Sequence, residues 1–252
     1  MKTSPPRLRM FAGPNGSGKS TLKTLLPPEL LGVYLNPDEI ESQIRHNGLI
    51  NFEDFGVVSN SNLDESILVF FRHSDFLKSQ DLSSSAEQLS VANGILDFSR
   101  IEMNSYFASV TTDCLRRQLL KQRTSFTFET VMSSPDKVTL LKEAQGLGYR
   151  TYLYFIATDD PSINISRVRN RVKQGGHSVP EDKIVSRYAR SLDLLIDAIR
   201  HTNRAFIFDN SGHSQDQTWL AEITDGQALE IKADQIPAWF TNTVLKKFQP
   251  YS

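Results

Sequence analysis

Residues 10–21 read "MFAGPNGSGKST", and this stretch decides the fold. Between Gly13 and Ser20 it follows the pattern G-x-x-x-x-G-K-S, with an apolar run before it and a helix-like run after it. Glycines at these positions let the backbone approach a phosphate closely, and the successive amides from about Asn15 to Ser20 point at the anion. The pattern therefore predicts a loop that binds the phosphates of a nucleoside triphosphate.

The polar residues of this loop have separable roles. We expect Lys19 to bridge the β- and γ-phosphates of ATP or GTP, and the Ser20 hydroxyl to ligate Mg²⁺. A chance match in a chain of this length has a probability of about 1%. The motif alone does not separate kinases from motor, switch or transport ATPases. The predicted nucleotide-binding residues of the loop are Gly13, Pro14, Asn15, Gly16, Ser17, Gly18, Lys19, Ser20 and Thr21.

Strand-like and helix-like segments alternate along the chain. The run 151–157 is almost continuously apolar and β-prone, which indicates a strand at the centre of the sheet, covered on both faces. Such alternation predicts a mostly parallel sheet that binds ligands beyond the carboxyl ends of its strands. We predict a single domain over residues 1–252, a kinase-type P-loop NTPase with a three-layer α/β/α fold and strand order 2-3-1-4-5. The expected strands are 7–12, 33–35, 124–129, 151–157 and 205–208, with a further candidate at 228–232.

Helix boundaries are marked by proline, asparagine and glycine. Asn36, Pro37 and Glu39 form a strong helix start. Residues 50–95 differ from the rest of the chain in composition and pattern. A serine-rich stretch over 79–90 follows an amphipathic segment over 63–77, and we interpret the whole as an insertion. The expected helices are 20–26, which Pro27 and Pro28 stop, 37–46, one within 97–122, 136–146, 161–173, one from 181 with an apolar stripe to Ile199, and 237–248.

Two acidic residues follow strands. Asp38 could act as the general base that takes a proton from an acceptor hydroxyl; alternatively it only complements the positive end of its helix. Glu129 could orient Mg²⁺ through water or hold the acceptor; alternatively it is a strand-end carboxylate paired with a lysine. Both are candidate catalytic residues. Asp209 also ends a strand, but that strand comes last among the main ones.

The segment "RVRNRVKQGGHSVPEDKIVSRYARSL" is rich in cations and has a double glycine, which suggests a hinged lid. Phosphoryl transfer needs positive charge over the γ-phosphate, and a closing lid excludes water. We favour Arg171 and Arg187 as catalytic, although surface arginines are common. The sequence "DNSG" at 209–212 is a candidate pocket for the base, with Asn210 as its ligand. No histidine pairs with another metal ligand at a suitable spacing.

The composition gives broader limits. The chain has 28 basic and 29 acidic residues, which argues against nucleic acid as a partner. Cys114 is the only cysteine, and neither a secretion signal nor a run of about 20 apolar residues is present. We therefore expect a soluble cytoplasmic protein without membrane contact.

Together these motifs resemble the zeta-toxin family of P-loop kinases, particularly its compact bacterial members. The resemblance covers most of residues 7–211 and rests on "GPNGSGKST", "LNPDEI", "SFTFETVMS", "GYRTYLYFIATDDP", the lid segment and "FDNS". It implies that Lys19 and Ser20 bind phosphate and metal, that Asp38 is the base, and that Glu129 is the acid after the third strand. It also places Arg171, His177 and Arg187 in the lid.

The resemblance further implies ATP or GTP with Mg²⁺ as cofactors, a hydroxyl of a nucleotide-sugar such as UDP-N-acetylglucosamine as acceptor, and an antitoxin partner. The chain reads Gly-Gly-His where larger toxins have an arginine, and its segment 50–95 is longer than in compact relatives. Two other functions stay open: a nucleotide-binding regulatory ATPase module, and a nucleoside or polynucleotide kinase.

Overall fold

The structure is a computed structural model that describes residues 4–176, 178–212 and 217–248. Its larger sheet has seven strands in the order β10-β9-β8-β7-β1-β6-β2. Strands β1, β7 and β8 are parallel neighbours, while β9 and β10 are antiparallel additions. Counted along the chain, the five main strands β1, β2, β6, β7 and β8 have the predicted order 2-3-1-4-5. The predicted fold class is confirmed.

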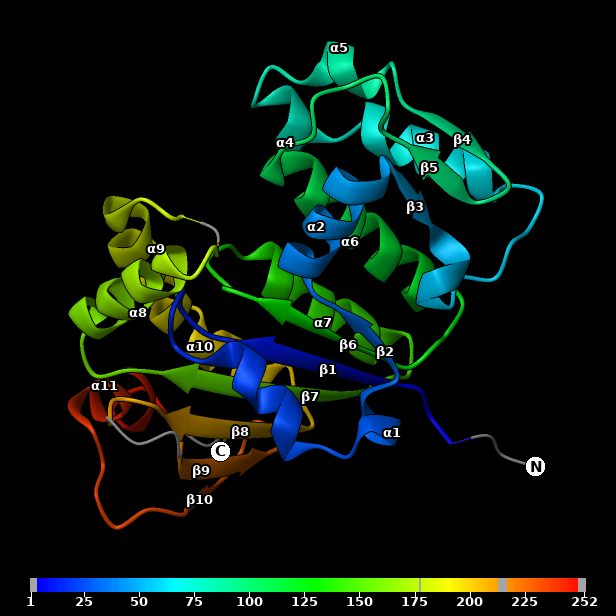
Figure 1. Cartoon of the computed structure of the whole chain (residues 1–252). Helices are drawn as coiled ribbons and strands as arrows, with labels where there is room; N and C mark the ends of the chain where they lie inside the picture. The colour runs from blue at the N-terminus through cyan, green and yellow to red at the C-terminus, as the bar shows by residue number, and fades with distance from the viewer. Residues whose placement is uncertain (1–3, 177, 213–216, 249–252) are drawn as a thin grey trace. The chain divides into compact units, whose positions relative to one another are not determined.

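The contacts divide the chain into two compact units, 1–31 with 127–252, and 32–126. The first unit carries the phosphate loop and most of the larger sheet (Figure 1). Its elements are β1 (Arg7–Ala12), the 3-10 helix η1 (Lys19–Leu25), α1 (Pro28–Leu31), the greater part of β6 (Phe126–Thr130), α7 (Asp136–Gly146), β7 (Arg150–Ala157), α8 (Pro161–Lys173), α9 (Glu181–Asp193), α10 (Leu195–Arg200), β8 (Arg204–Asp209), β9 (Thr218–Thr224), β10 (Ala228–Ile231), α11 (Ala238–Phe240) and the π-helix η3 (Thr241–Leu245).

The register of the parallel strands shows why one end of this sheet holds the site. Ala12 pairs with Phe155 and Ala157 with Asp209, so the last residues of β1, β7 and β8 lie close together. The core under these strands consists of fully buried side chains, among them Met10, Leu153 and Ile207. As predicted, β7 lies inside the sheet, between β1 and β8. Helices α8 and α9 lie side by side beyond the carboxyl ends of these strands (Figure 1).

The second unit has its own small core. Its elements are β2 (Val33–Leu35), α2 (Pro37–Asn47), β3 (Leu49–Asn51), η2 (Phe52–Phe55), α3 (Leu63–Arg72), α4 (Asp75–Lys78), α5 (Ser83–Ala86), β4 (Ser90–Ala92), β5 (Ile95–Asp97) and α6 (Ser105–Lys121). Buried aromatic rings meet edge to face, with centroids 6.3 Å apart for both Phe71–Phe98 and Phe98–Phe107. Strands β3, β5 and β4 form a separate antiparallel sheet beside these helices (Figure 1).

Several local predictions are wrong in detail. The helix after the phosphate loop is a seven-residue 3-10 helix, and α1 begins at Pro28, because proline is tolerated in a first turn where its missing amide has no partner to lose. The amphipathic segment 63–77 breaks at Ser74, whose hydroxyl caps the new helix α4. Strand β9 and the small sheet β3-β5-β4 were not predicted from the sequence.

Other boundaries are confirmed closely. Helices α2, α7 and α8 occupy 37–47, 136–146 and 161–173, against predicted ranges of 37–46, 136–146 and 161–173. Asp160 caps α8 by accepting from the amide of Ser162 at 2.6 Å. Within the described ranges, no helix is both long and apolar enough to cross a membrane.

Candidate nucleotide-binding site

The phosphate loop has a backbone that only glycine adopts easily. Gly13, Gly16 and Gly18 have φ angles of 148°, 75° and 101°. A Cβ at Gly13 would lie 2.0 Å from the carbonyl oxygen of Ile156, and one at Gly18 would lie 2.5 Å from Nδ2 of Asn210. The glycines of the motif are therefore required by both conformation and space.

Two asparagines from distant elements hold the loop. Asn164, a fully buried residue of α8, donates its amide to the carbonyl of Asn15 at 2.6 Å. Asn210, which follows β8, donates its amide to the carbonyl of Ser17 at 2.8 Å. The carbonyls of Asn15 and Ser17 are thus held by side chains from α8 and from the segment after β8, which fixes the form of a loop of the kind that binds anions.

The side chains of Lys19 and Ser20 both make hydrogen bonds beside the loop. The Lys19 ammonium donates to the carbonyl of Pro14 at 2.8 Å, so its side chain lies along the loop. The Ser20 hydroxyl donates to a carboxylate oxygen of Glu129 at 3.3 Å, and Glu129 is buried. A hydroxyl and a carboxylate side by side are the hard oxygen ligands that Mg²⁺ prefers. These two residues therefore fit a magnesium ion.

Hydrogen bonds continue from the loop to helix α9. Asn164 accepts from the Thr158 hydroxyl through its amide oxygen, and the Thr158 carbonyl accepts from the Tyr188 hydroxyl at 2.6 Å. Burial, together with the nearby carboxylates of Asp159, Asp160 and Asp209, raises the pKa of Tyr188 to about 12. Tyr188 therefore stays protonated and acts as a donor at neutral pH.

The lid arginines occupy different environments. Arg171 is exposed near the end of α8, and a Cβ on Gly176 would lie 2.6 Å from its Cγ. Arg187 is half-buried on α9. Arg169 pairs with Glu181 and so joins the two helices, while Arg167 donates to the carbonyl of Gly212 at 3.1 Å.

The catalytic roles of Arg171 and Arg187 stay predictions, and His177 lies outside the described residues.

Asp38 belongs to the second unit. It is an exposed residue in the first turn of α2, and its backbone amide donates to Oδ1 of Asn36 at 2.9 Å. Asn36 is therefore the helix cap, as predicted, and the Asp38 carboxylate is not needed for that role. Its part as the general base stays a prediction.

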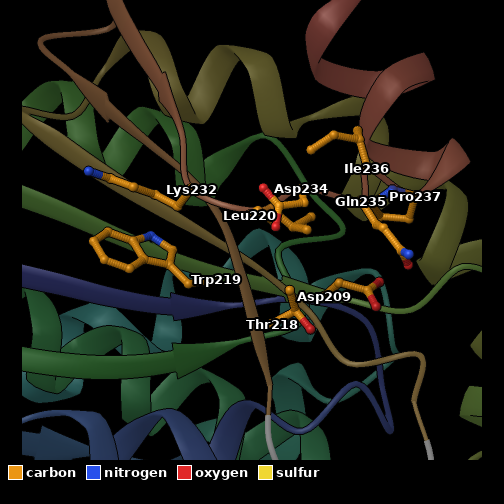
Figure 2. Close-up of a pocket in the computed structure, with 10 residues that line it drawn as sticks. Asp209, Thr218, Trp219, Leu220, Lys232, Asp234, Gln235, Ile236 and Pro237 are labelled. Atoms are coloured by element: carbon orange, nitrogen blue, oxygen red, sulfur yellow. The ribbon is translucent and has the colours of Figure 1, made fainter.

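A pocket of about 620 Å³ lies near the end of β8 and the start of β9 (Figure 2). Asp209 in its wall accepts from the Trp239 indole at 2.7 Å and from the Ser211 hydroxyl at 2.7 Å, so this carboxylate is a structural group. Lys232 pairs with Glu230, and its ammonium lies 5.0 Å from the centre of the Trp219 ring. Asp209 and Lys232 thus both interact with other side chains of the protein.

The residues whose side chains hold the loop in place were not predicted from the sequence. Asn164, Thr158 and Tyr188 lie about 140 to 175 positions beyond it, and nothing in their local sequence connects them with it. Asn210 was predicted to contact the base of the nucleotide. In the structure its side-chain amide donates to the Ser17 carbonyl of the phosphate loop. A further residue, Gln217, donates its amide to the Thr21 hydroxyl.

Comparisons with known proteins give a family match for part of the chain. Residues 99–216, a little under half of the chain, match the family model described as Zeta toxin. The matched range contains Glu129, the lid segment and Asn210, while the phosphate loop and Asp38 precede it. The predicted resemblance to zeta toxins is confirmed over these residues.

Solved structures show the same fold at low identity. The AvrRxo1-ORF1:AvrRxo1-ORF2 complex with ATP has a TM-score of 0.54 and 13% identity, covering 92% of this chain and 61% of that one. The same complex with sulphate ions gives a TM-score of 0.54, 13% identity, and 92% and 62% coverage.

A curated protein also matches. An uncharacterised protein of Haemophilus influenzae is 33% identical over 69 residues, which are 27% of this chain and 49% of that protein. The chain thus spans about half the length of this relative and about three fifths of the solved chains.

Proposed function

We propose that this chain is a kinase that transfers the γ-phosphate of ATP, or of GTP, to a hydroxyl of a small acceptor. The observation that carries the proposal is the braced loop, in which Lys19 lies along the loop and the Ser20 hydroxyl meets the Glu129 carboxylate. The match of residues 99–216 to the Zeta toxin model supports the same chemistry. The acceptor in this proposal is a nucleotide-sugar such as UDP-N-acetylglucosamine.

Each predicted residue has a place in the transfer. The loop amides and Lys19 bind the phosphates, and Arg171 and Arg187 neutralise charge on the γ-phosphate. Ser20 and Glu129 would hold Mg²⁺, which when bound neutralises the phosphates further. Asp38 takes the proton of the acceptor hydroxyl, whose oxygen bonds to the γ-phosphorus while the bond to the β-phosphate oxygen breaks. ADP then leaves. Catalysis of this kind depends on positioning and electrostatics.

The experiment is a transfer assay with γ-labelled ATP, Mg²⁺ and a panel of UDP-sugars. We expect label on a sugar with the native chain, and a loss of at least about 100-fold for Lys19→Ala, as when one charge-stabilising donor is removed. Lys23→Ala, an exposed lysine of the same helix η1, is the matched control and should keep full activity. If no sugar becomes labelled, the acceptor is not a UDP-sugar. If Lys19→Ala turns over as fast as the native chain, the phosphate loop is not the site of transfer.

Toxicity and an antitoxin partner belong to the same proposal. The AvrRxo1-ORF1 structure is a complex of two components with ATP, which supports a protein partner for this chain as well. Induced expression should slow growth with the native chain and not with Lys19→Ala. Consumption of ATP without a labelled small molecule would instead favour the regulatory ATPase.

A further inference from the structure

One buried acceptor beside the phosphate loop is not used by the groups described so far. The side-chain oxygen Oε1 of Gln217 is buried and has no hydrogen-bond partner among the residues that the structure describes. Gln217 immediately precedes β9, whose first residue Thr218 pairs with Asp209 at the carboxyl end of β8. A buried acceptor without a donor costs about 1–3 kcal/mol. Such a cost at the ligand end of the sheet indicates a ligand group that satisfies it.

The orientation of this amide is fixed by a short chain of hydrogen bonds. The Thr21 hydroxyl donates its single proton to the carbonyl of Gly18 at 2.6 Å. It can therefore only accept from Gln217, and the group that it accepts from must be the Nε2 amine. The free end of Gln217 is consequently the oxygen, an acceptor. This polarity follows from the bonding of Thr21 and does not depend on how the two ends of the amide were assigned.

The position of Gln217 relates it to the nucleoside end of the ligand. The Ser20 hydroxyl faces Glu129, which marks the side of the metal and the γ-phosphate. In a 3-10 helix the next residue points about 120° away, since three residues make one turn. That residue is Thr21, and its side chain meets Gln217.

The opposite side of the loop is closed. A Cβ on Gly16 would lie 2.6 Å from the carbonyl oxygen of Asn164 and 3.2 Å from Val168, so helix α8 packs directly against the backbone there. With the phosphates in the loop, we therefore place the nucleoside on the side of Thr21, whose hydroxyl contacts Gln217.

We propose that Gln217 accepts a hydrogen bond from the exocyclic amine of adenine, and so selects adenine nucleotides over 6-oxopurine nucleotides. The inference rests on the proposed binding of a nucleoside triphosphate at this loop. Guanine and hypoxanthine present a carbonyl oxygen in place of the adenine amine, and two acceptors facing each other leave both unsatisfied. Gln217 is thus a specificity-determining residue of the donor nucleotide.

The test measures equilibrium binding with Mg²⁺ for three triphosphates: ATP, purine riboside triphosphate, which lacks the amine, and inosine triphosphate, which has the carbonyl. For the native chain we expect ATP to bind about 3- to 10-fold more tightly than purine riboside triphosphate, the effect of one neutral hydrogen bond. Inosine triphosphate should bind more weakly still. In Gln217→Leu, ATP and purine riboside triphosphate should bind equally.

Two further variants keep the test decisive. Gln227→Leu, in the exposed turn between β9 and β10, is the matched control and should retain the native preference. Thr21→Val removes the group that orients Gln217, so the ratio of ATP to inosine triphosphate affinity should shrink even where overall affinity falls. If Gln217→Leu fails to fold, the ratio of ATP to inosine triphosphate affinity can still be measured in Thr21→Val.

The possible outcomes separate this inference from the proposed function. If the native chain binds all three triphosphates equally, or if Gln217→Leu keeps the native preference, the role of Gln217 is refuted and the kinase proposal stands. If the native chain binds none of them, both proposals fail together.

Discussion

In the first unit, the phosphate loop is fixed by side chains from distant parts of the chain, whereas in the second unit Asp38 is fixed by a local helix cap. Asn164 and Asn210 bond the loop across 149 and 193 positions of sequence. Asn36 caps the helix of Asp38 from two positions away. The phosphate loop therefore depends on the tertiary fold of its unit, while the helix start around Asp38 is encoded by four consecutive residues.

The largest expected effect tests the catalytic part of the second unit. Asp38→Asn should lower the rate of phosphoryl transfer by about 100- to 10,000-fold, the contribution of a general base. ATP affinity should not change, because the predicted phosphate-binding residues belong to the first unit. Glu39→Gln, an exposed neighbour in the same turn, is the matched control. Undiminished turnover in Asp38→Asn, measured with labelled ATP, would show that the second unit does not supply the base.

A matched pair of glycines comes next. Gly18→Ala should weaken ATP binding by about tenfold or more, because its φ of 101° is strained for alanine and its Cβ would strike Asn210. Gly48→Ala, at the end of α2, has a φ of 69° and nothing within 4 Å of the new Cβ. It should cost only about 1–2 kcal/mol of stability, the price of a left-handed residue, and leave ATP binding unchanged. ATP titration measures the affinity of both variants, and urea unfolding measures their stability. Normal ATP binding by Gly18→Ala would contradict the prediction.

The brace of the loop gives the third prediction. Asn164→Ala leaves the Asn15 carbonyl and the Thr158 hydroxyl without this partner, and should cost about 1–3 kcal/mol of stability. ATP affinity should also fall, because the loop loses its fixed form. Asn170→Ala, exposed on the same helix, should do neither. If Asn164→Ala unfolds at the native urea midpoint and binds ATP normally, the brace is unimportant.

A local cap in the second unit should have a smaller and separate effect. Asn104 caps α6 by accepting from the amides of Tyr106 and Phe107 at 3.0 and 3.2 Å. Asn104→Ala should lower stability by about 1 kcal/mol, and ATP affinity should stay at the native value. A loss of ATP affinity in this variant would contradict the separate roles of the two units.

The smallest effect is a pH dependence in the first unit. The pKa of Tyr188 is raised from 10.0 to about 12 in the folded protein, so its contribution to stability is complete below pH 10 and is lost as the pH rises toward 12. Tyr188→Phe should be less stable than the native chain at pH 8, because it lacks the bond to Thr158. The difference should narrow between pH 10 and pH 12 in urea unfolding. A constant difference would mean that Tyr188 titrates normally.

The same contrast explains how much could be predicted from the sequence. Local signals were sufficient for α2, because Asn36 and Pro37 fix its start, and for the glycine pattern of the loop. Glu129 was predicted as a group that orients Mg²⁺ or holds the acceptor because it follows a strand. Its contact with the Ser20 hydroxyl was not predicted from the sequence.

Long-range contacts and weak patterns were not predictable. Asn164 looks like an ordinary polar residue in the first turn of α8, and only the fold brings it to Asn15. Strand β9 was missed although it pairs along β8, and the three-residue strands of the small sheet are too short to show a period.

The most direct test of the kinase account is a crystal structure with a non-hydrolysable ATP analogue, Mg²⁺ and a UDP-sugar bound. The account predicts a triphosphate on the amides of residues 15–20, with Lys19 and Ser20 at its phosphates. It also predicts a sugar hydroxyl within about 2.6–3.2 Å of the Asp38 carboxylate, the reach of a general base. A triphosphate bound elsewhere, or an acceptor hydroxyl far from Asp38, would contradict it.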